Sequence, residues 1–390
     1  MTQSGHHTSP ASAGGPTCIK GQHAWRTISH RSNPANQLEY YLLLPLAFLR
    51  HCAQESFAGK AGFHQFCWQQ KFSHGPWRTK IILTILEQRL GLLDARQRLG
   101  IGKDHQSQQF DQGIDLSHLE KPARSPVLIR TVLRAMGLYR RGISNAAKVT
   151  LRHNHIVSTH LPKAFDGFDI VQLSDLHVEM NAAAMERVVD LLGEAHFDVC
   201  VLTGDYRGGT NGRYDTTLAG MARVRESLKS PIYGVLGDHD TICMVPGLEA
   251  MGIRMLLNES VIIERSGQRI HLGGIGDAHF HGMENIEKAA AAIPHDEFSI
   301  LISHTPEVYR QAAHIGFNVL LSGHTHGGQI CLPGGIPITL NSALPRSMGS
   351  GAWKYHGMIG YTSVGAGSSI IPVRFNCPPE ITLHHLHVSS

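Results

Sequence analysis

Residues 168–177 read FDIVQLSDLH, an apolar run from Phe168 to Ser174 that ends at Asp175, Leu176 and His177. Four further runs rich in Val, Ile and Leu end at polar residues in the same way, at 197–203, 232–236, 298–302 and 319–322. Helical patterns lie between several of these runs, which is typical of an α/β protein with mixed sheets. Binding sites of open α/β sheets form at the carboxyl ends of strands, so we expect the five polar ends to lie together.

The polar ends consist of carboxylates and histidines: Asp175, His177, Asp205, Asp238, His239, Asp240, His304, His324 and His326. Residues i and i+2 of an extended segment point the same way, so Asp175 and His177 can approach one ion. The glycines before Asp205, Asp238 and His324 allow sharp turns and close backbone approach. Mixed Asp and His ligation without cysteine suits divalent ions such as Mn, Fe, Zn, Co or Mg. One ion does not need so many ligands, so a pair of ions that share Asp205 is the simpler interpretation.

The same patterns predict the other elements of the carboxyl-terminal part of the chain. We expect strands at 154–160, 358–364 and 381–387, a hairpin of 261–265 with 269–273, and helices at 182–194, 214–229 and 306–313. Residues 151–390 would then form the domain that carries the chemistry.

The amino-terminal part differs in composition. Residues 1–36 are rich in Ser, Gly, Pro, His and Asn without periodicity, which predicts disorder. Residues 37–150 are expected to form a helical, partly basic extension, with one helix over Lys80–Leu99 that has a single apolar face. The longest apolar run near the amino terminus, Tyr40–Leu49, is too short to span a bilayer.

Residues 121–152 contain eight basic residues and no acidic one. Ser125 and Pro126 are a favourable helix start, and Gly142 a plausible stop. Such a basic amphipathic helix favours contact with an anionic membrane surface. The alternative is an ordinary surface helix that packs on the main domain with its arginines in water.

Composition narrows the class of protein. The chain has 390 residues, of which 42% are hydrophobic and 17% charged, as expected for a globular protein with a sizeable core. Seven cysteines without a CxxC pair favour a reducing compartment, and the sequence does not open on a secretory signal pattern. We therefore expect a cytoplasmic protein, at the inner face of the membrane if residues 121–152 bind lipid. No nucleic-acid recognition motif is present, so no specific nucleic acid is predicted as a partner.

The polar ends resemble, in order, the five motifs of the calcineurin-like metallophosphoesterases: SDLH, LTGD, GDHD, SHTPE and SGHTHGGQ. The segments LPKAFDGFDIVQLSDLH and PVRFNCPPEIT are similar to the class of bacterial phosphodiesterases with GHTHGGQ, which includes a UDP-2,3-diacylglucosamine pyrophosphatase of lipid A synthesis. The resemblance covers residues 150–390. It implies two mixed β-sheets packed as a sandwich and flanked by helices, with the helical extension in front.

The resemblance also implies residue roles. Asp175, His177, Asp205 and His326 would hold the first divalent ion, and Asp205, Asp238, His304 and His324 the second, with Mn, Fe, Zn or Mg as the metal. His239 would act on the phosphate or the leaving group, and Asp240 would orient it. The implied reaction is hydrolysis of a phosphodiester or pyrophosphate bond, by in-line attack of a hydroxide held between the ions. A membrane-borne nucleotide-lipid such as UDP-2,3-diacylglucosamine would be a substrate.

Asp238 departs from the family pattern, which has Asn at this position. Our hypothesis is that Asp238 still binds metal, holds it more tightly, and weakens the attraction of the site for a phosphate anion. The same departure leaves open a metal-poor, catalytically changed scaffold of this fold. A general phosphodiesterase or nuclease would use the same metals and is a further alternative.

Some other polar residues are expected to have structural roles only. Asp277 and His279 are expected in a loop, Arg346 and Arg374 at the surface, and His384, His385 and His387 along a late strand.

Overall fold

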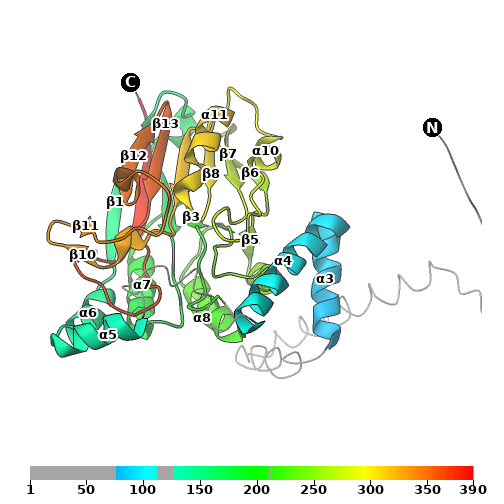
Figure 1. The fold of residues 1–390 in the computed structure, drawn as a ribbon. Coiled ribbons are helices and arrows are strands. Elements are labelled where there is room, and N and C mark those ends of the chain that lie inside the picture. The colour runs from blue at the N-terminus through cyan, green and yellow to red at the C-terminus, as the bar shows by residue number, and fades with distance from the viewer. Residues whose placement is uncertain (1–75, 112–125, 211, 390) are drawn as a thin grey trace, which may run out of the picture. The chain divides into compact units, whose positions relative to one another are not determined.

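The computed structural model describes residues 76–111, 126–210 and 212–389 (Figure 1). All of them belong to one compact unit, His74–Ser390. The predicted disorder of residues 1–36 and the apolar run Tyr40–Leu49 lie outside the described residues.

The first of two six-stranded sheets has the strand order β1-β14-β2-β3-β4-β5. Its strands are β1 (Thr150–Ser158), β2 (Phe168–Leu173), β3 (Val199–Leu202), β4 (Ile232–Gly234), β5 (Ile253–Met255) and β14 (Glu380–Val388). Strands β2 to β5 run parallel, whereas β14 is antiparallel to β2 and parallel to β1. The carboxyl ends of β2, β3 and β4 therefore lie at one edge of this sheet.

The second sheet has the order β12-β13-β9-β8-β7-β6. Its strands are β6 (Glu259–Arg265), β7 (Gln268–Gly274), β8 (Ser299–Ile302), β9 (Val319–Ser322), β12 (Gly351–Tyr355) and β13 (Met358–Thr362). Its four inner strands are parallel and its two edge strands antiparallel. Two short strands, β10 (Cys331–Leu332) and β11 (Ile336–Pro337), form a separate hairpin after β9.

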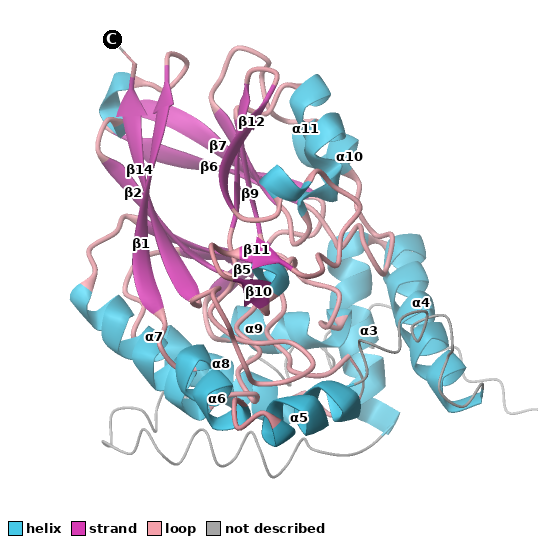
Figure 2. Ribbon diagram, turned by 60° about the vertical axis from the view of Figure 1, so that its left-hand side comes forward, coloured by secondary structure: helices cyan, strands magenta, loops and turns pink. Residues whose placement is uncertain are grey.

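The core between the sheets is built from side chains of both, such as Ile170 and Val201 from the first and Ile300 and Leu321 from the second. The outer face of the first sheet is covered by α7 (Ala182–Glu194), α8 (Asp215–Glu226) and α9 (Val245–Ala250). The second sheet is covered by α10 (Ile286–Ala290) and α11 (Tyr309–Ile315), on the opposite side of the sandwich (Figure 2). The expected sandwich of two mixed sheets flanked by helices is confirmed.

The amino-terminal helices differ from the prediction because glycines interrupt them. The single helix expected over Lys80–Leu99 is two helices, α3 (Pro76–Leu90) and α4 (Leu92–Asp111), separated by Gly91 with a φ of +81°. Similarly, α5 (Pro126–Ala135) starts at the predicted proline but ends before Gly137, whose φ is +70°. A left-handed backbone conformation ends a helix, and glycine adopts it without steric cost.

Gly142 is not the predicted helix stop but lies inside α6 (Tyr139–Ala146). A Cβ atom at this position would come within 2.8 Å of the side chains of Val373 and Phe375. Gly142 therefore allows the helix to pack closely on the segment before β14.

Helix α7 matches the predicted bounds because the side chain of Asn181 caps it by accepting a hydrogen bond from the backbone of Ala184. The strands β5, β10, β11 and β12 were not predicted. Three of them have only two or three residues, too few for a period-2 pattern to appear.

Candidate metal centre

The expected site residues meet at the ends of five strands, β2, β3, β4, β8 and β9, and several of them have an unusual backbone. Positive φ angles occur at Asp175 (50°), His177 (40°), Asp205 (57°), His324 (69°) and His326 (50°). A non-glycine residue in this conformation costs of order 1–3 kcal/mol, and such residues cluster at functional sites. The surrounding fold thus holds these side chains where they would not otherwise be placed.

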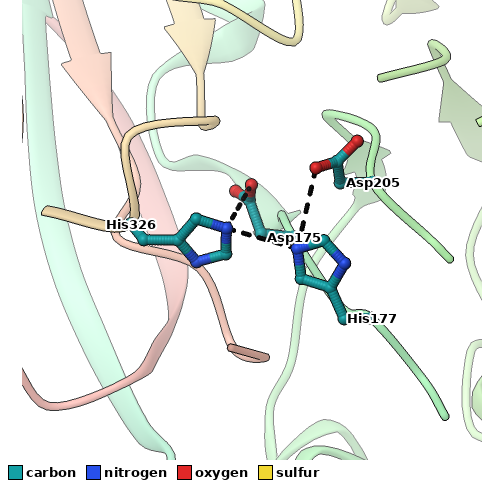
Figure 3. Close-up of side chains that lie close together, drawn as sticks. All are labelled: Asp175, His177, Asp205 and His326. Atoms are coloured by element: carbon teal, nitrogen blue, oxygen red, sulfur yellow. Dashed lines mark hydrogen bonds and ion pairs between the residues drawn. The ribbon is translucent and has the colours of Figure 1, made fainter. Parts of the chain in front are cut away.

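The first cluster contains Asp175, His177, Asp205 and His326, whose ligand atoms all lie within 4.8 Å of one another (Figure 3). The Nε2 atoms of His177 and His326 are 3.2 Å apart. His177 Nε2 lies 3.6 Å from Asp205 Oδ2, and His326 Nε2 lies 3.4 Å from Asp175 Oδ1. All four side chains are buried, so they face one another rather than solvent.

The second cluster contains Asp238, His304 and His324. Asp238 Oδ1 lies 2.7 Å from His304 Nε2 and 3.2 Å from His324 Nδ1, and these two nitrogens are 3.2 Å apart. Asp205 Oδ1 lies 3.5 Å from His304 Nε2, whereas its Oδ2 faces His177. The two oxygens of Asp205 therefore face the two clusters.

Backbone carbonyls orient three of the histidines. Nδ1 of His177 contacts the carbonyl of Arg207, and Nδ1 of His304 lies 2.8 Å from that of Thr203. Nε2 of His324 lies 2.8 Å from the carbonyl of Asn341. In a neutral ring, an N–H donated to a carbonyl leaves the other nitrogen, which faces the cluster, with its lone pair free, as in metal-ligating histidines.

Burial and neighbouring charges set the protonation of the site. Burial lowers the pKa of His177 to about 3 and that of His326 well below the ordinary value, so both rings are neutral at pH 7. Burial opposes a charge on His304, but the carboxylates of Asp205 and Asp238 raise its pKa well above the ordinary range. Burial likewise opposes ionisation of Asp238, yet hydrogen bonds with His304 and His324 hold its pKa well below the ordinary value. Asp238 is therefore a carboxylate.

These donor sets fit a pair of divalent ions. The seven side chains offer three carboxylates and four imidazoles without a thiolate, the mixture that borderline and hard divalent ions accept. They form two groups, and Asp205 faces both of them, so a pair of ions could share this carboxylate.

Two glycines make this close packing feasible. A Cβ atom at Gly237 would overlap Asp205, and one at Gly323 would overlap Ser174 and Asp175. The expectation that the glycines before Asp238 and His324 permit close backbone approach is confirmed.

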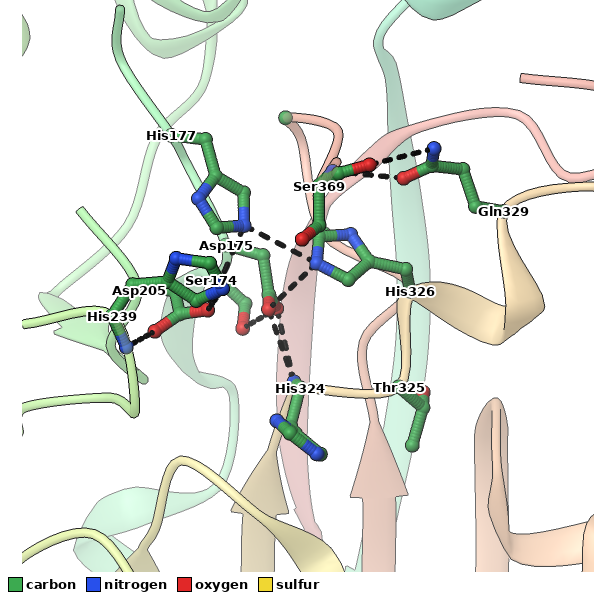
Figure 4. Close-up of polar contacts among 12 residues, drawn as sticks. Ser174, Asp175, His177, Asp205, His239, His324, Thr325, His326, Gln329 and Ser369 are labelled. Atoms are coloured by element: carbon green, nitrogen blue, oxygen red, sulfur yellow. Dashed lines mark hydrogen bonds and ion pairs between the residues drawn. The ribbon is translucent and has the colours of Figure 1, made fainter. Parts of the chain in front are cut away.

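His239 lies where both clusters meet and is partly exposed, with 19% of its side chain accessible. Its Nε2 is 3.9 Å from Oδ2 of both Asp205 and Asp238. Its backbone N–H donates to Asp205 Oδ1 at 3.0 Å (Figure 4). Its Nδ1 lies 3.4 Å from the hydroxyl of Thr210. The ring therefore borders both clusters and remains accessible to a bound molecule.

Asp240 makes different contacts from those expected. Its carboxylate accepts hydrogen bonds from the backbone N–H groups of Asp205, Tyr206, Arg207 and Gly237 at 2.8–3.3 Å. The Asp240 carboxylate therefore joins the loop after β3 to the loop after β4. We expected it to orient the His239 ring directly, but its hydrogen bonds hold the backbone of these two loops.

Arg374, expected at the surface, is fully buried. Its Nη2 donates to the carbonyls of Val364 and Gly367 at 2.7 and 2.6 Å and lies 3.4 Å from His326 Nδ1. The guanidinium thus holds the loop behind His326. The sequence around it gave no sign of this, because the contacts arise where the β13–β14 connection folds back on itself, 7–10 residues before Arg374.

His279 lies beside the site, although it was expected to be an ordinary loop residue. Its ring centroid is 4.3 Å from that of His324, and its Nδ1 is 2.9 Å from Glu307 Oε2. Glu307 in turn accepts hydrogen bonds from the Ser342 hydroxyl and the Ala343 N–H. One feature of the sequence could have indicated this position: GDAHF (276–280) follows an apolar run, as the ligand motifs do.

The other polar residues lie where they were expected. The Asp277 carboxylate accepts hydrogen bonds from backbone N–H groups of residues 279–281 in a tight loop. Arg346 is exposed, and His384, His385 and His387 lie along β14.

Comparisons with known proteins agree with this geometry. The family model for calcineurin-like phosphoesterases matches residues 168–328. YkoQ of Bacillus subtilis, named as an uncharacterized metallophosphoesterase, is 30% identical over 229 residues, which are 56% of this chain and 83% of YkoQ. The phosphodiesterase YaeI of Escherichia coli is 25% identical over 233 residues, which are 56% of this chain and 82% of YaeI.

Among solved structures, the calcineurin-like phosphoesterase YfkN of Bacillus subtilis aligns over 51% of this chain and 81% of that chain, with 14% identity and a TM-score of 0.35, too low to support any inference. The family model and the sequence relatives establish the family without this structural comparison. The chain belongs to the calcineurin-like metallophosphoesterases and is a phosphoesterase that uses divalent metal ions.

Proposed function

We propose that this enzyme hydrolyses phosphodiester or pyrophosphate bonds with a pair of divalent ions. Asp175, His177, Asp205 and His326 hold one ion, and Asp205, Asp238, His304 and His324 hold the other. The observation that supports this assignment is the placement of Asp205, whose Oδ2 faces His177 while its Oδ1 faces His304. A carboxylate so placed can bind to both ions at once.

Two bound ions supply a nucleophilic water at neutral pH and stabilise the charge that develops on the phosphoryl oxygens. The protein contributes buried histidines that are already neutral, His177 and His326, so no proton has to leave them when metal binds. His304 differs, because Asp205 and Asp238 favour its charged form, so metal binding there releases a proton.

His239 is the residue that we assign to the phosphate or the leaving group. Its ring borders both clusters and, like Asp238, is partly exposed. From there it can donate a proton to a departing oxygen or a hydrogen bond to a phosphoryl oxygen. Asp240 supports this role indirectly, since its carboxylate holds the loop from which His239 projects.

A membrane-associated substrate is supported by α5. Leu133 of this helix is buried against Ile371 and Val373, so the helix packs on the domain. Its outer side exposes Val127 (72%), Leu128 and Val132 to solvent, and Met136 (63%), directly after the helix, is exposed as well. Exposed apolar side chains on a helix are typical of a membrane-surface segment.

The charge around α5 agrees with an anionic surface. Exposed arginines at 134, 140 and 141 lie on α5 and α6, and no acidic residue occurs between 121 and 152. Among the described helices, none is both long and apolar enough to cross a membrane. We therefore propose peripheral contact with the inner face of the cell membrane, and a nucleotide-lipid such as UDP-2,3-diacylglucosamine as substrate.

Metal analysis combined with a substrate panel tests the proposal. We expect about two metal equivalents in the purified protein, and fewer in His304→Asn. The exposed His356→Asn is the matched control and should keep both ions. A scaffold without catalysis would bind less than one equivalent and hydrolyse nothing in the panel.

The panel separates the substrates. UMP release from UDP-2,3-diacylglucosamine in vesicles, faster than hydrolysis of bis(p-nitrophenyl) phosphate, supports the lipid role. Hydrolysis of the aryl diester alone would contradict it while leaving the two-metal assignment intact.

A further inference from the structure

Four histidines form a row on the outer face of the first sheet, far along the chain from the metal centre motifs. His153 and His155 lie on β1, and His385 and His387 lie on β14, the strand that pairs with β1 in parallel. Residues two apart on a strand point to the same side, so the four rings share one face. They stack on one another, with centroids of successive rings 4.9–5.2 Å apart. Figure 2 shows β1, β14 and β2 side by side at this edge.

The ring nitrogens approach one another in two pairs. His153 Nδ1 lies 2.9 Å from His385 Nε2, and His155 Nδ1 lies 3.0 Å from His387 Nε2. Two imidazole nitrogens that bind one ion at about 2.0–2.1 Å, at a right angle, are separated by about 2.9 Å. Tetrahedral ligands of the same ion would be about 3.3 Å apart. The observed spacing therefore matches square-planar or tetragonal coordination, which Cu(II) and Ni(II) prefer.

Carboxylates support the rings from the other side. His385 Nδ1 lies 2.6 Å from Asp169 Oδ1, and His387 Nδ1 lies 3.7 Å from Asp166 Oδ1. The Asp166 carboxylate lies near His387 but beyond hydrogen-bond distance. Donation of the His385 Nδ1 proton to Asp169 leaves the lone pair on Nε2, the nitrogen that faces His153. This carboxylate–histidine arrangement is the one that usually accompanies metal-ligating histidines.

We propose that the pairs His153–His385 and His155–His387 are two chelating sites for Cu(II) or Ni(II), separate from the catalytic pair of ions. Asp169 lies at the amino end of β2, whereas Asp175 follows its carboxyl end. Six residues of extended chain span about 20 Å, so the two places do not share a ligand. Hydrogen bonding between neutral rings, without metal affinity, is the alternative explanation of the same distances.

Copper uptake by the full chain, prepared without a histidine tag, tests the proposal. The protein is first saturated with Zn(II) so that the catalytic centre is filled, then titrated with Cu(II). Bound copper and zinc are measured together, and the electron paramagnetic resonance spectrum reports imidazole ligands. We expect His153→Asn/His385→Asn to bind one copper equivalent less than the natural chain. His314→Asn/His356→Asn, which removes two exposed histidines of the second sheet region, should bind as much as the natural chain.

Apart from the replaced pairs, the natural chain and the two double variants have the same histidines, including those of residues 1–75. The difference in copper uptake between these proteins therefore reports on the replaced pair alone. Asp169→Asn keeps both rings and should weaken the affinity for copper by about 10- to 100-fold. Unchanged hydrolysis of an aryl phosphodiester shows that each variant is folded and leaves the catalytic proposal unaffected. Equal copper uptake by the natural chain and the His153/His385 variant, or uptake only in exchange for zinc, would overturn the proposal.

Discussion

Replacement of Asp238 by Asn tests how the second cluster works. Asp238 Oδ1 lies 2.7 Å from His304 Nε2 and 3.2 Å from His324 Nδ1, and the carboxylate is ionised. Asparagine has the same shape and retains a carbonyl oxygen, so it removes one negative charge with little change in packing. Two results are expected: weaker metal binding and stronger binding of an anionic substrate.

The size of the effect follows from the distances. Two unit charges about 6 Å apart, at an effective dielectric of about 20, interact by about 3 kcal/mol. Because Asp238 is partly exposed, the repulsion of a bound phosphodiester anion will be smaller. We expect the KM for the aryl diester to fall by about tenfold, or about 1.4 kcal/mol. The same charge attracts a metal ion, so the affinity of the second site for metal should fall by at least as much.

The assay combines metal content after dialysis against a weak chelator with steady-state kinetics at saturating metal. Asp296→Asn makes the same chemical change in an exposed residue that lies in neither proposed metal site, and it should alter neither quantity. A variant that retains the natural metal content and KM would refute the assignment of Asp238 as a charged ligand.

Four further outcomes are expected. His239→Ala should lower kcat by about 10²–10⁴-fold with both metals retained, measured by kinetics and elemental analysis; loss of metal would instead make His239 a ligand. Gly323→Ala should lose metal and activity because its Cβ overlaps Asp175, whereas Gly209→Ala, with open space around it, should behave as the natural protein. Arg374→Met should lower the free energy of unfolding by about 3 kcal/mol or more, in denaturant titration, because buried carbonyls lose their donor; a change under 1 kcal/mol would contradict this. Burial lowers the pKa of His384 from 6.5 to about 3, so the unfolded chain binds a proton that the folded chain does not. Between these pH values its contribution to stability should decrease by about 1.4 kcal/mol per unit as pH falls, and His384→Gln should flatten that part of the pH–stability curve.

Much of the site could be predicted from local sequence. Each catalytic ligand directly follows an apolar strand, so its place at the edge of a sheet depends on neighbouring residues. Asp205 illustrates this, since the run that ends at it forms β3, and parallel pairing with β2 brings it towards Asp175 and His177. The glycines before these residues also indicated close backbone approach, because the absence of a Cβ atom can be read directly from the sequence.

Interactions between distant segments could not be predicted in this way. The carboxylate of Asp240 binds amides 33–35 positions away instead of its neighbour His239. Arg374 is buried for a more local reason that no periodicity indicates, since residues 364–367 of its own β13–β14 connection turn their carbonyls towards it. His279 reaches the site because Glu307, 28 positions away, holds its ring.

The sequence by itself determined the α/β class, the strand ends and which residues we propose as metal ligands, because periodicity and residue type are local properties. Only the tertiary structure decided which oxygen of Asp205 faces which cluster, and that His153 meets His385 across 232 positions. The reason is physical: strand pairing and loop packing depend on the burial of the whole core, and they set the few ångströms on which hydrogen bonding and metal binding depend.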